Sequence, residues 1–521
     1  MKKLNVKIGG LAIVLAMSCQ IASAQHLPSP SLSTKVKAEA FSKSQVEPLS
    51  TFMTDFMGPR LAGSQMKFRA EKLVVDKLKE MGFSNVRIEV ALDNFTKGSW
   101  DNEKNYVAMT APYYCSFAAN PKAWSGSTKG LVKAEAVLVD ISSEKDFEQY
   151  KGKLAGKIIL MPSTQTYEMK FEPLATRYTE EELAALAIDS RVSSGARRNP
   201  RPPMDMAAYN FQRRLPELLK NEGVVAIISG GGTFNVPSSR GANYKQGDPE
   251  PLPEIILPLE DHGRMCRLVK MGEKVEMELE IRNKFTESKV INNVIAEIPG
   301  TDPKLKDEIV LIGAHFDSWH GSTGAADNAS GCIVMMEAMR IIKALGISPR
   351  RTIRLALWGG EEQGLYGSRG YSQSYLYDAE KNKKLAGYDK FALYLNMDNG
   401  SGRFRGIYLE QTDAAVPFME TWMEPLKSLG FNTLTLRTTG GTDHMSFTRL
   451  GLPAYQFIQD ELEYDRTYHT VMDTYERLSL SDLKTDAAIV AWLVLCAAQD
   501  DDRIPAKEGY PQPQPQRPPM M

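Results

Sequence analysis

The first candidate catalytic or metal-binding residues follow an apolar run at 309–314. His315 and Asp317 come directly after this run, and in an extended chain residues two apart project to the same side. The Asp317 carboxylate could therefore orient His315, leaving the other imidazole nitrogen free to bind a metal ion. Ten residues on, Asp327 lies in a Gly/Ala-rich loop where small residues permit close backbone approach.

Further acids and a histidine follow the next apolar runs. Glu361 and Glu362 are adjacent, and their carboxylates would repel each other unless a cation shared the site. Neighbouring side chains diverge, so one carboxylate could bind metal while the other serves as general base. Asp398 follows a third run, and His469 is the last imidazole of the chain. Two imidazoles and three carboxylates suit two zinc ions that share one acid, although each residue alone also fits an ordinary capping or surface role.

The elements that must position these groups alternate between strand and helix. We expect strands at 309–314, 352–358 and 391–397, and a helix at about 329–345 that stops before Gly346 and Pro349. This alternation predicts an α/β fold with a mixed sheet flanked by helices. In such sheets functional residues gather beyond the carboxyl ends of the strands, where the candidate ligands lie.

The residues before about 290 show a different sequence pattern. Amphipathic helices are predicted over 35–90, with a strand at 86–92, and short β-branched runs from about 130 to 285 indicate an inserted β-rich module. Inside it, 178–221 contains a helical excursion and an Arg/Pro-rich stretch that we interpret as a solvated loop. The predicted organisation is a signal peptide at 1–24, an N-terminal helical part of the main domain at 25–127, the insertion at 128–285, the rest of the main domain, which carries the candidate ligands, at 286–503 and a disordered Pro/Gln-rich tail at 504–521.

Composition narrows the class of partner. The 521 residues contain 63 Lys+Arg and 64 Asp+Glu, so there is no excess positive charge to hold a nucleic acid. Four cysteines follow the N-terminal segment; they lie far apart and form no CxxC pair. We interpret them as free thiols, because a chain of this length can bury a core that is stable without disulfides. One long-range disulfide is left open.

The N-terminus has the order of a secretory signal: lysines, a short apolar run at 11–17, then Ala22-Ser23-Ala24. Cleavage after Ala24 and a periplasmic or secreted location are expected, with no permanent membrane span. The alternative is a lipoprotein anchored through Cys19, but the residue three positions upstream is alanine instead of the usual leucine.

Several segments together resemble the M28 family of di-zinc exopeptidases. They read GAHFDSWHGSTGAADNASG, LALWGGEEQGLYGS, NMDNGSG, GGTDHMSF and YHTVMDTYE. Within the family the chain is most similar to the branch that contains carboxypeptidase Q. GPRLAGS at 58–64 and an insertion similar to a protease-associated domain extend the likeness over nearly the whole mature chain.

The resemblance implies a role for each residue of the set. Asp327 would bridge two zinc ions, Glu362 and His469 would complete one site, and His315 and Asp398 the other. Glu361 would be the general base and Asp317 the orienting acid, and the Asp327–Asn328 peptide bond would be cis. Cobalt or manganese could occupy the same ligands.

The resemblance also implies hydrolysis of small peptides with a free amino terminus, by attack of a metal-bridged water. Aminopeptidase or dipeptidase action is favoured, and a carboxypeptidase of the same fold is the alternative. A receptor-like binding protein would be expected to have lost ligands, and a one-zinc transferase similar to glutaminyl cyclase would differ in metal stoichiometry. A homodimer is left open.

Other polar residues near these motifs have two interpretations each. His444 could bind substrate or support a loop, and Trp319 and His320 could line the pocket or pack beside it. We interpret Cys332 as a core residue, because no base is arranged for it, and Asp473 as the cap of the next helix.

Overall fold

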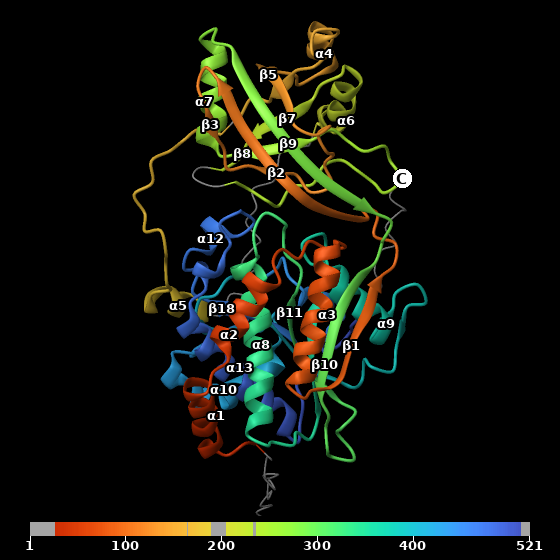
Figure 1. The fold of residues 1–521 in the computed structure, drawn as a ribbon. Coiled ribbons are helices and arrows are strands. Elements are labelled where there is room, and N and C mark those ends of the chain that lie inside the picture. The colour runs from red at the N-terminus through yellow and green to blue at the C-terminus, as the bar shows by residue number, and fades with distance from the viewer. Residues whose placement is uncertain (1–26, 164, 189–204, 233–235, 512–521) are drawn as a thin grey trace, which may run out of the picture.

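The computed structural model describes residues 27–163, 165–188, 205–232 and 236–511, arranged in two lobes (Figure 1). The expected signal peptide and the Arg/Pro-rich stretch at 197–203 lie outside these ranges. Within them each lobe is built on one eight-stranded sheet. No helix of this described part is long and apolar enough to cross a membrane.

The larger lobe has a mixed sheet with helices on both faces. Its strand order is β1 (Ser84–Leu92), β10 (Ile291–Ile298), β12 (Thr352–Trp358), β11 (Ile309–His315), β15 (Phe391–Asn396), β18 (Ala454–Gln459), β16 (Phe404–Tyr408) and β17 (Thr433–Thr435). Its helices are α1 (Pro30–Ser42), α2 (Val46–Thr51), α3 (Gln65–Glu80), α8 (Ser330–Ala344), α9 (Tyr366–Tyr375), α10 (Val416–Met423), α11 (Met445–Thr448), α12 (Tyr464–Thr467) and α13 (Leu480–Gln499). This architecture confirms the predicted α/β fold class.

The larger lobe is built around α8 and α13. Both helices are buried almost all round, pack against each other and cover one face of the sheet. Strands β11, β12 and β15 are parallel neighbours, mostly apolar and buried along nearly their whole length, as expected for strands covered on both faces. Their carboxyl ends therefore meet at one edge of the lobe.

The second lobe carries its own sheet, ordered β3 (Cys115–Ser116), β2 (Ser99–Ala111), β9 (Val275–Thr286), β5 (Val132–Leu138), β6 (Ile158–Leu160), β7 (Ala226–Gly230), β8 (Glu254–Leu257) and β4 (Asn120–Pro121). Its helices are α4 (Glu144–Tyr150), α6 (Met206–Asn221) and α7 (Leu259–Lys270), while α5 (Glu180–Ala187) lies beside the larger lobe (Figure 1). The burial of β9 alternates residue by residue, which is typical of a strand with one face on a core.

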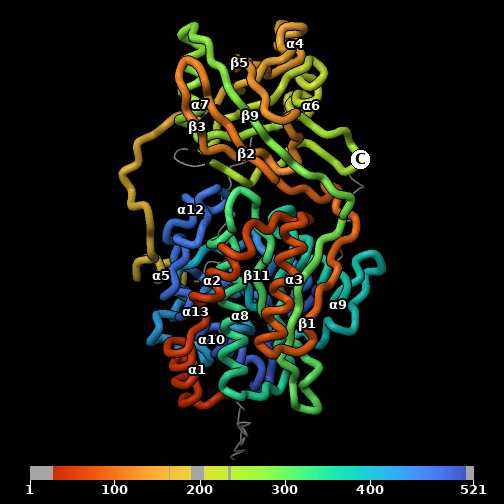
Figure 2. The backbone as a smooth tube through the Cα atoms, in the orientation of Figure 1, coloured from red at the N-terminus to blue at the C-terminus, as the bar shows by residue number. Residues whose placement is uncertain are grey.

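The second sheet begins earlier than the expected boundary at 128. Strand β2 pairs with β9 from Ser99 opposite Thr286 to Ala111 opposite Glu276. This long antiparallel ribbon makes 99–127 part of the second sheet, because β2 continues β1 across the lobe junction and β9 returns into β10 (Figure 2).

The C-terminal tail also differs from the prediction of disorder over 504–521. Ile504 is buried in the main core, and the Lys507 N–H donates to the Gly451 carbonyl. An apolar anchor and a main-chain hydrogen bond are enough to order 504–511, and the rest of the tail lies beyond the described residues.

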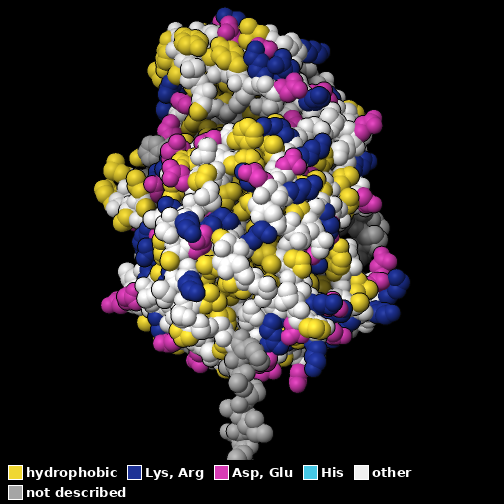
Figure 3. Space-filling model, turned by 60° about the horizontal axis from the view of Figure 1, so that its bottom comes forward, with side chains coloured by type: hydrophobic (Ala, Val, Ile, Leu, Met, Phe, Trp, Pro, Cys, Tyr) yellow, Lys and Arg dark blue, Asp and Glu magenta, His cyan; other side chains and the backbone are white. Residues whose placement is uncertain are grey.

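All four described cysteines are free thiols, as expected. Cys332 and Cys496 are buried, whereas Cys115 and Cys266 are only half-buried. Acidic and basic side chains are interspersed over the face drawn in Figure 3, in line with the balanced charge of the chain.

Candidate active site

The structure brings the five expected metal ligands into two overlapping groups. His315 ends β11, Glu362 follows β12, and Asp398 lies two residues beyond β15. His315, Asp327 and Asp398 form one group, and Asp327, Glu362 and His469 form the other. In each group the candidate ligand atoms all lie within 4.8 Å of one another.

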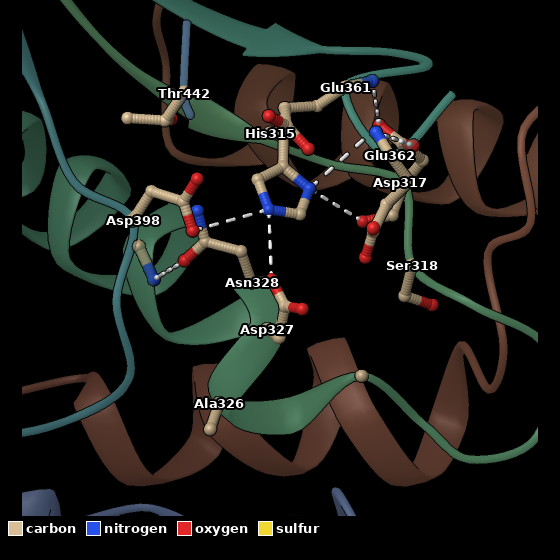
Figure 4. Close-up of polar contacts among 12 residues, drawn as sticks. His315, Asp317, Ser318, Ala326, Asp327, Asn328, Glu361, Glu362, Asp398 and Thr442 are labelled. Carbon is tan, nitrogen blue, oxygen red and sulfur yellow. Dashed lines mark hydrogen bonds and ion pairs between the residues drawn. The ribbon is translucent and has the colours of Figure 1, made fainter. Parts of the chain in front are cut away.

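Asp327 belongs to both groups and divides its two oxygens between them. Its Oδ1 lies 3.0 Å from His315 Nε2, and its Oδ2 lies 3.1 Å from His469 Nε2. His315 Nε2 is also 3.5 Å from Asp398 Oδ1, and His469 Nε2 is 2.8 Å from Glu362 Oε2. Figure 4 shows Asp327 and Asp398 converging on the same imidazole nitrogen. This is the arrangement expected of a carboxylate shared by two cations.

The electrostatics of the acids fit cations as well. Burial and the neighbouring Asp327 carboxylate raise the pKa of Glu362 to about 8, and its Oε1 atom is buried with no hydrogen-bond partner. Burial also raises the pKa of Glu361 well above its ordinary value, and Asp398 adds to the rise. Several carboxylates crowded into a buried site ionise together only when positive charge joins them.

The imidazoles respond to the same acids in the opposite sense. Burial alone would lower the pKa of His469, but its hydrogen bonds to Asp327 and Glu362 raise it to about 10. His315 behaves likewise: burial opposes its charge, but Asp398 and Asp327 raise its pKa well above the ordinary value. The imidazoles of His315 and His469 thus face carboxylate oxygens that favour a positively charged partner. Nitrogen and carboxylate donors in this number fit zinc.

Asp317 orients the site differently from the prediction. The His315 Nδ1–H is 3.0 Å from the main-chain carbonyl of Asp317, whereas the carboxylate is 3.9 Å away. The carboxylate instead accepts the N–H groups of Glu361 at 3.1 Å and Glu362 at 3.3 Å. The chain turns after His315, so the carbonyl and not the side chain reaches the imidazole. Asp317 therefore positions the two glutamates.

The loop that carries Asp327 depends on Gly324. This glycine has φ +58°, and a Cβ there would lie 2.3 Å from the Ser318 side chain. The Asp327–Asn328 peptide bond is cis, as the resemblance implied. The Asn328 side chain then donates to the Met397 carbonyl at 2.8 Å, linking the loop to the segment that carries Asp398.

Asp473 holds the same loop and was not recognised as a site residue from the sequence. Its carboxylate accepts the N–H groups of Ala326 at 2.6 Å and Asp327 at 3.0 Å instead of capping the helix that follows it. The signal was present in the YHTVMDTYE segment, which places Asp473 four residues after His469.

Arg60 is a second support that sequence reasoning missed, although GPRLAGS was part of the resemblance. Its fully buried guanidinium donates to the carbonyls of Phe316, Thr323 and Gly324 at 2.7–2.9 Å. These carbonyls belong to the loop between His315 and Asp327, and so Arg60 fixes the path between two candidate ligands.

The second lobe contacts two of the loops near the candidate ligands, the loop after His315 and the turn that carries His469. His320 Nε2 lies 2.8 Å from the Pro121 carbonyl, and Ser238 N–H donates to the His469 carbonyl at 2.8 Å. Val471 N–H donates back to the Val236 carbonyl at 2.9 Å, beside His469, whose backbone has φ +56°. The lobe thus pairs with the turn that presents a candidate ligand.

A cavity of about 880 Å³ opens over the cluster. Four of the acidic candidates and His469 line it, together with aromatic residues from several elements: Tyr178, Tyr408, Phe457, Tyr464 and Tyr468. His444, expected as a substrate-binding candidate, does not line it. His444 immediately precedes α11 and is fully buried, with its Nε2 3.6 Å from Glu410, because the loop turns Thr442 and Met445 toward the cavity instead.

The remaining candidates have structural roles. Trp319 donates its Nε1–H to Glu362 at 2.7 Å and stands edge-on to Trp124 of the second lobe. Cys332 is buried and donates to the His315 carbonyl, and burial raises its thiol pKa to about 12, which excludes a thiolate nucleophile.

Residues 293–494 match the model of peptidase family M28. The chain therefore contains a peptidase family M28 domain, which forms most of the larger lobe, called the catalytic lobe below. It is 26% identical to mouse carboxypeptidase Q over 458 residues, which cover 87% of this chain and 85% of that one. This domain and the likeness to carboxypeptidase Q support a metallopeptidase of the exopeptidase class.

Solved structures agree on the fold. The M28 peptidase precursor from Shewanella amazonensis aligns with a TM-score of 0.64 at 23% identity, covering 92% of this chain and 98% of that one. BSAP, a zinc aminopeptidase from Bacillus subtilis, aligns with a TM-score of 0.52 at 18% identity, covering 88% and 98%.

Proposed function

We propose that the chain is a two-zinc exopeptidase that hydrolyses small peptides with a free amino terminus. The observation that carries the proposal is the division of the Asp327 oxygens between His315 and His469. His315 and Asp398 would complete one zinc site, and Glu362 and His469 the other. Cobalt or manganese would fit the same donors.

Zinc at these ligands supplies a Lewis acid that activates water and stabilises the developing oxyanion. Glu361 then acts as general base, taking a proton from the attacking water and passing it to the departing amine nitrogen. Its raised pKa suits a group that must both accept and return a proton. Asp317 keeps Glu361 and Glu362 in place through their N–H groups.

The polarity of cleavage follows from the charges in the cavity. Acidic side chains predominate along it, and two of them, Glu461 and Asp465, stand apart from the zinc ligands. A free ammonium group is attracted by such a surface. The likeness to a zinc aminopeptidase supports the same polarity. Arg449, a cation on the same cavity, is the group that a carboxypeptidase would use.

The test is a panel of free, N-blocked and C-blocked dipeptides and tripeptides, with purified zinc-loaded protein and a chelator control. Blocking the amine should abolish cleavage, and the chelator should abolish it for every peptide. Loss of cleavage only on C-terminal blocking would reverse the polarity, and no cleavage of any peptide would contradict the peptidase assignment.

Metal analysis tests the zinc count separately. Two zinc ions per chain are expected, and a stoichiometry of one would favour a transferase with a single zinc. We also propose that 128–285 belongs to a protease-associated-like module. We further propose that the N-terminal signal directs the chain to the periplasm or the exterior and is cleaved after Ala24, and that a homodimer can form. The mass of the intact secreted protein tests the cleavage site, and its oligomeric state in solution tests the homodimer.

A further inference from the structure

The second lobe sends one segment down to the catalytic cavity. This strap, residues 165–179, leaves the second lobe after β6 and runs along the side of the molecule to α5 (Figures 1 and 2). Helix α5 then packs against β17 of the catalytic sheet. A residue at the end of the strap, Tyr178, lines the cavity that holds the candidate zinc ligands.

The end of the strap is tightly fixed. Thr176 and Leu462 exchange two main-chain hydrogen bonds, at 2.8 and 3.0 Å. Arg177 pairs with the buried carboxylates of Asp460 at 2.8 Å and Asp482 at 2.7 Å. The Tyr178 N–H donates to Asp460 at 3.0 Å. Because the backbone on each side of it is anchored, Tyr178 forms a fixed wall of the cavity.

Tyr178 meets Tyr408 at this wall, and a hydrogen bond links the two hydroxyl groups. Tyr408 ends β16 and pairs with Gln456 of β18, which in turn pairs with Asn396 of β15. Asn396 precedes Asp398 by two residues, so the backbone of Tyr408 at the base of the wall lies two strand spacings, about 10 Å, from the strand that leads to this ligand. An extended peptide covers that distance with about three residues.

We propose that Tyr178 closes the peptide-binding cavity on the side of β16 and limits the substrate to about three residues. This inference rests on the proposed peptidase function and names the length of its substrates. The second lobe thereby sets specificity, since the residue that ends the cavity belongs to its strap. The substrate class is unblocked di- and tripeptides.

The experiment compares kcat/KM for unblocked alanine peptides of two to five residues. The wild type should cleave di- and trialanine well and tetra-alanine poorly. In Tyr178→Ala the ratio of tetra-alanine to dialanine should rise at least tenfold, because the wall is removed while the main-chain anchors stay. Tyr178→Phe should keep the wild-type ratio, as should Phe171→Ala, a control on the exposed middle of the strap.

A binding measurement separates chain length from turnover. In the Glu361→Gln background, calorimetry should show that Tyr178→Ala lowers the Kd of tetra-alanine at least tenfold relative to the Kd of dialanine. An unchanged ratio in a folded Tyr178→Ala protein with full zinc content would overturn the inference. A change only among dipeptides with different side chains would overturn it too, since Tyr178 would then border a side-chain pocket. A zinc-loaded wild type that cleaves none of the peptides would instead overturn the proposed function.

Discussion

At the scale of single residues, the acids of the site divide between holding metal and moving protons. Asp327 shares its oxygens between two imidazoles, whereas Glu361 lines the cavity and is held to Asp317 through its main-chain N–H. The two kinds of acid should therefore respond differently to substitution.

Glu361→Gln should retain both zinc ions and lower kcat by about 10²–10⁴-fold, because the amide fills the same space but accepts no proton. Zinc content by mass spectrometry and kcat on a dipeptide measure the two effects. Asp327→Ala is the matched comparison and should lose zinc. A Glu361→Gln protein with near-normal kcat would show that another group is the base.

Asp317→Asn should lower kcat/KM by about 10–100-fold, the usual effect of disturbing a group that orients active-site residues. The asparagine oxygen can still accept one of the two N–H groups, but its NH₂ would face the other. Steady-state kinetics and zinc content check this. Unchanged kinetics would mean that the glutamates hold their positions without the carboxylate.

At the scale of elements, buried polar side chains hold in place the loops that follow the strands. Arg60→Lys should destabilise the protein by roughly 3 kcal/mol, because lysine cannot reach all of the loop carbonyls that the guanidinium binds and buried carbonyls lose their donors. Denaturant unfolding measures the loss. Arg69→Lys, on the exposed side of α3, is the control and should change stability little.

Asp486 on α13 makes the stability of this helix pH-dependent. Burial raises its pKa well above the ordinary value, so the folded protein keeps a proton that the unfolded chain releases above about pH 4. The stability from this group is complete at lower pH and falls as pH rises toward the folded pKa. Asp486→Asn still accepts the Phe404 N–H and should raise Tm at pH 7.5 more than at pH 4.5.

The exposed Asp76→Asn is the matched control for this pH comparison and should shift Tm equally at both pH values. An equal shift for Asp486→Asn would mean that its carboxyl ionises in the folded protein as it does in the unfolded chain.

Much of the catalytic lobe follows from local sequence pattern. Apolar runs predicted strands at 309–314, 352–358 and 391–397, and the structure has them within one residue at each end. The convergence of His315 and Asp398 follows because parallel neighbours end at one edge. The roles of Arg60 and the Asp317 carboxylate could not be predicted, since they bind main-chain groups whose position depends on the folded loops. The boundary at 99 was missed because a ribbon of strands crosses both lobes.

At the scale of the whole molecule, the proposed zinc ligands come from segments separated by some 150 residues, from His315 to His469. Chelation should therefore lower Tm, because a ligand that binds only the folded state at 100 times its Kd adds about 2.7 kcal/mol. Calorimetry with and without chelator measures the shift, which should be a few degrees for a chain of this size. Restoring zinc should restore Tm, and a Tm indifferent to chelator would contradict a metal centre that bridges these segments.

The pairing of 236–238 with 469–471 bears on how this protein can be re-engineered. A shortened enzyme made by excising 99–286 would lose the neighbour that supports the turn carrying His469, as well as Tyr178. Chimeras that borrow this lobe from a relative would have to match it at both places.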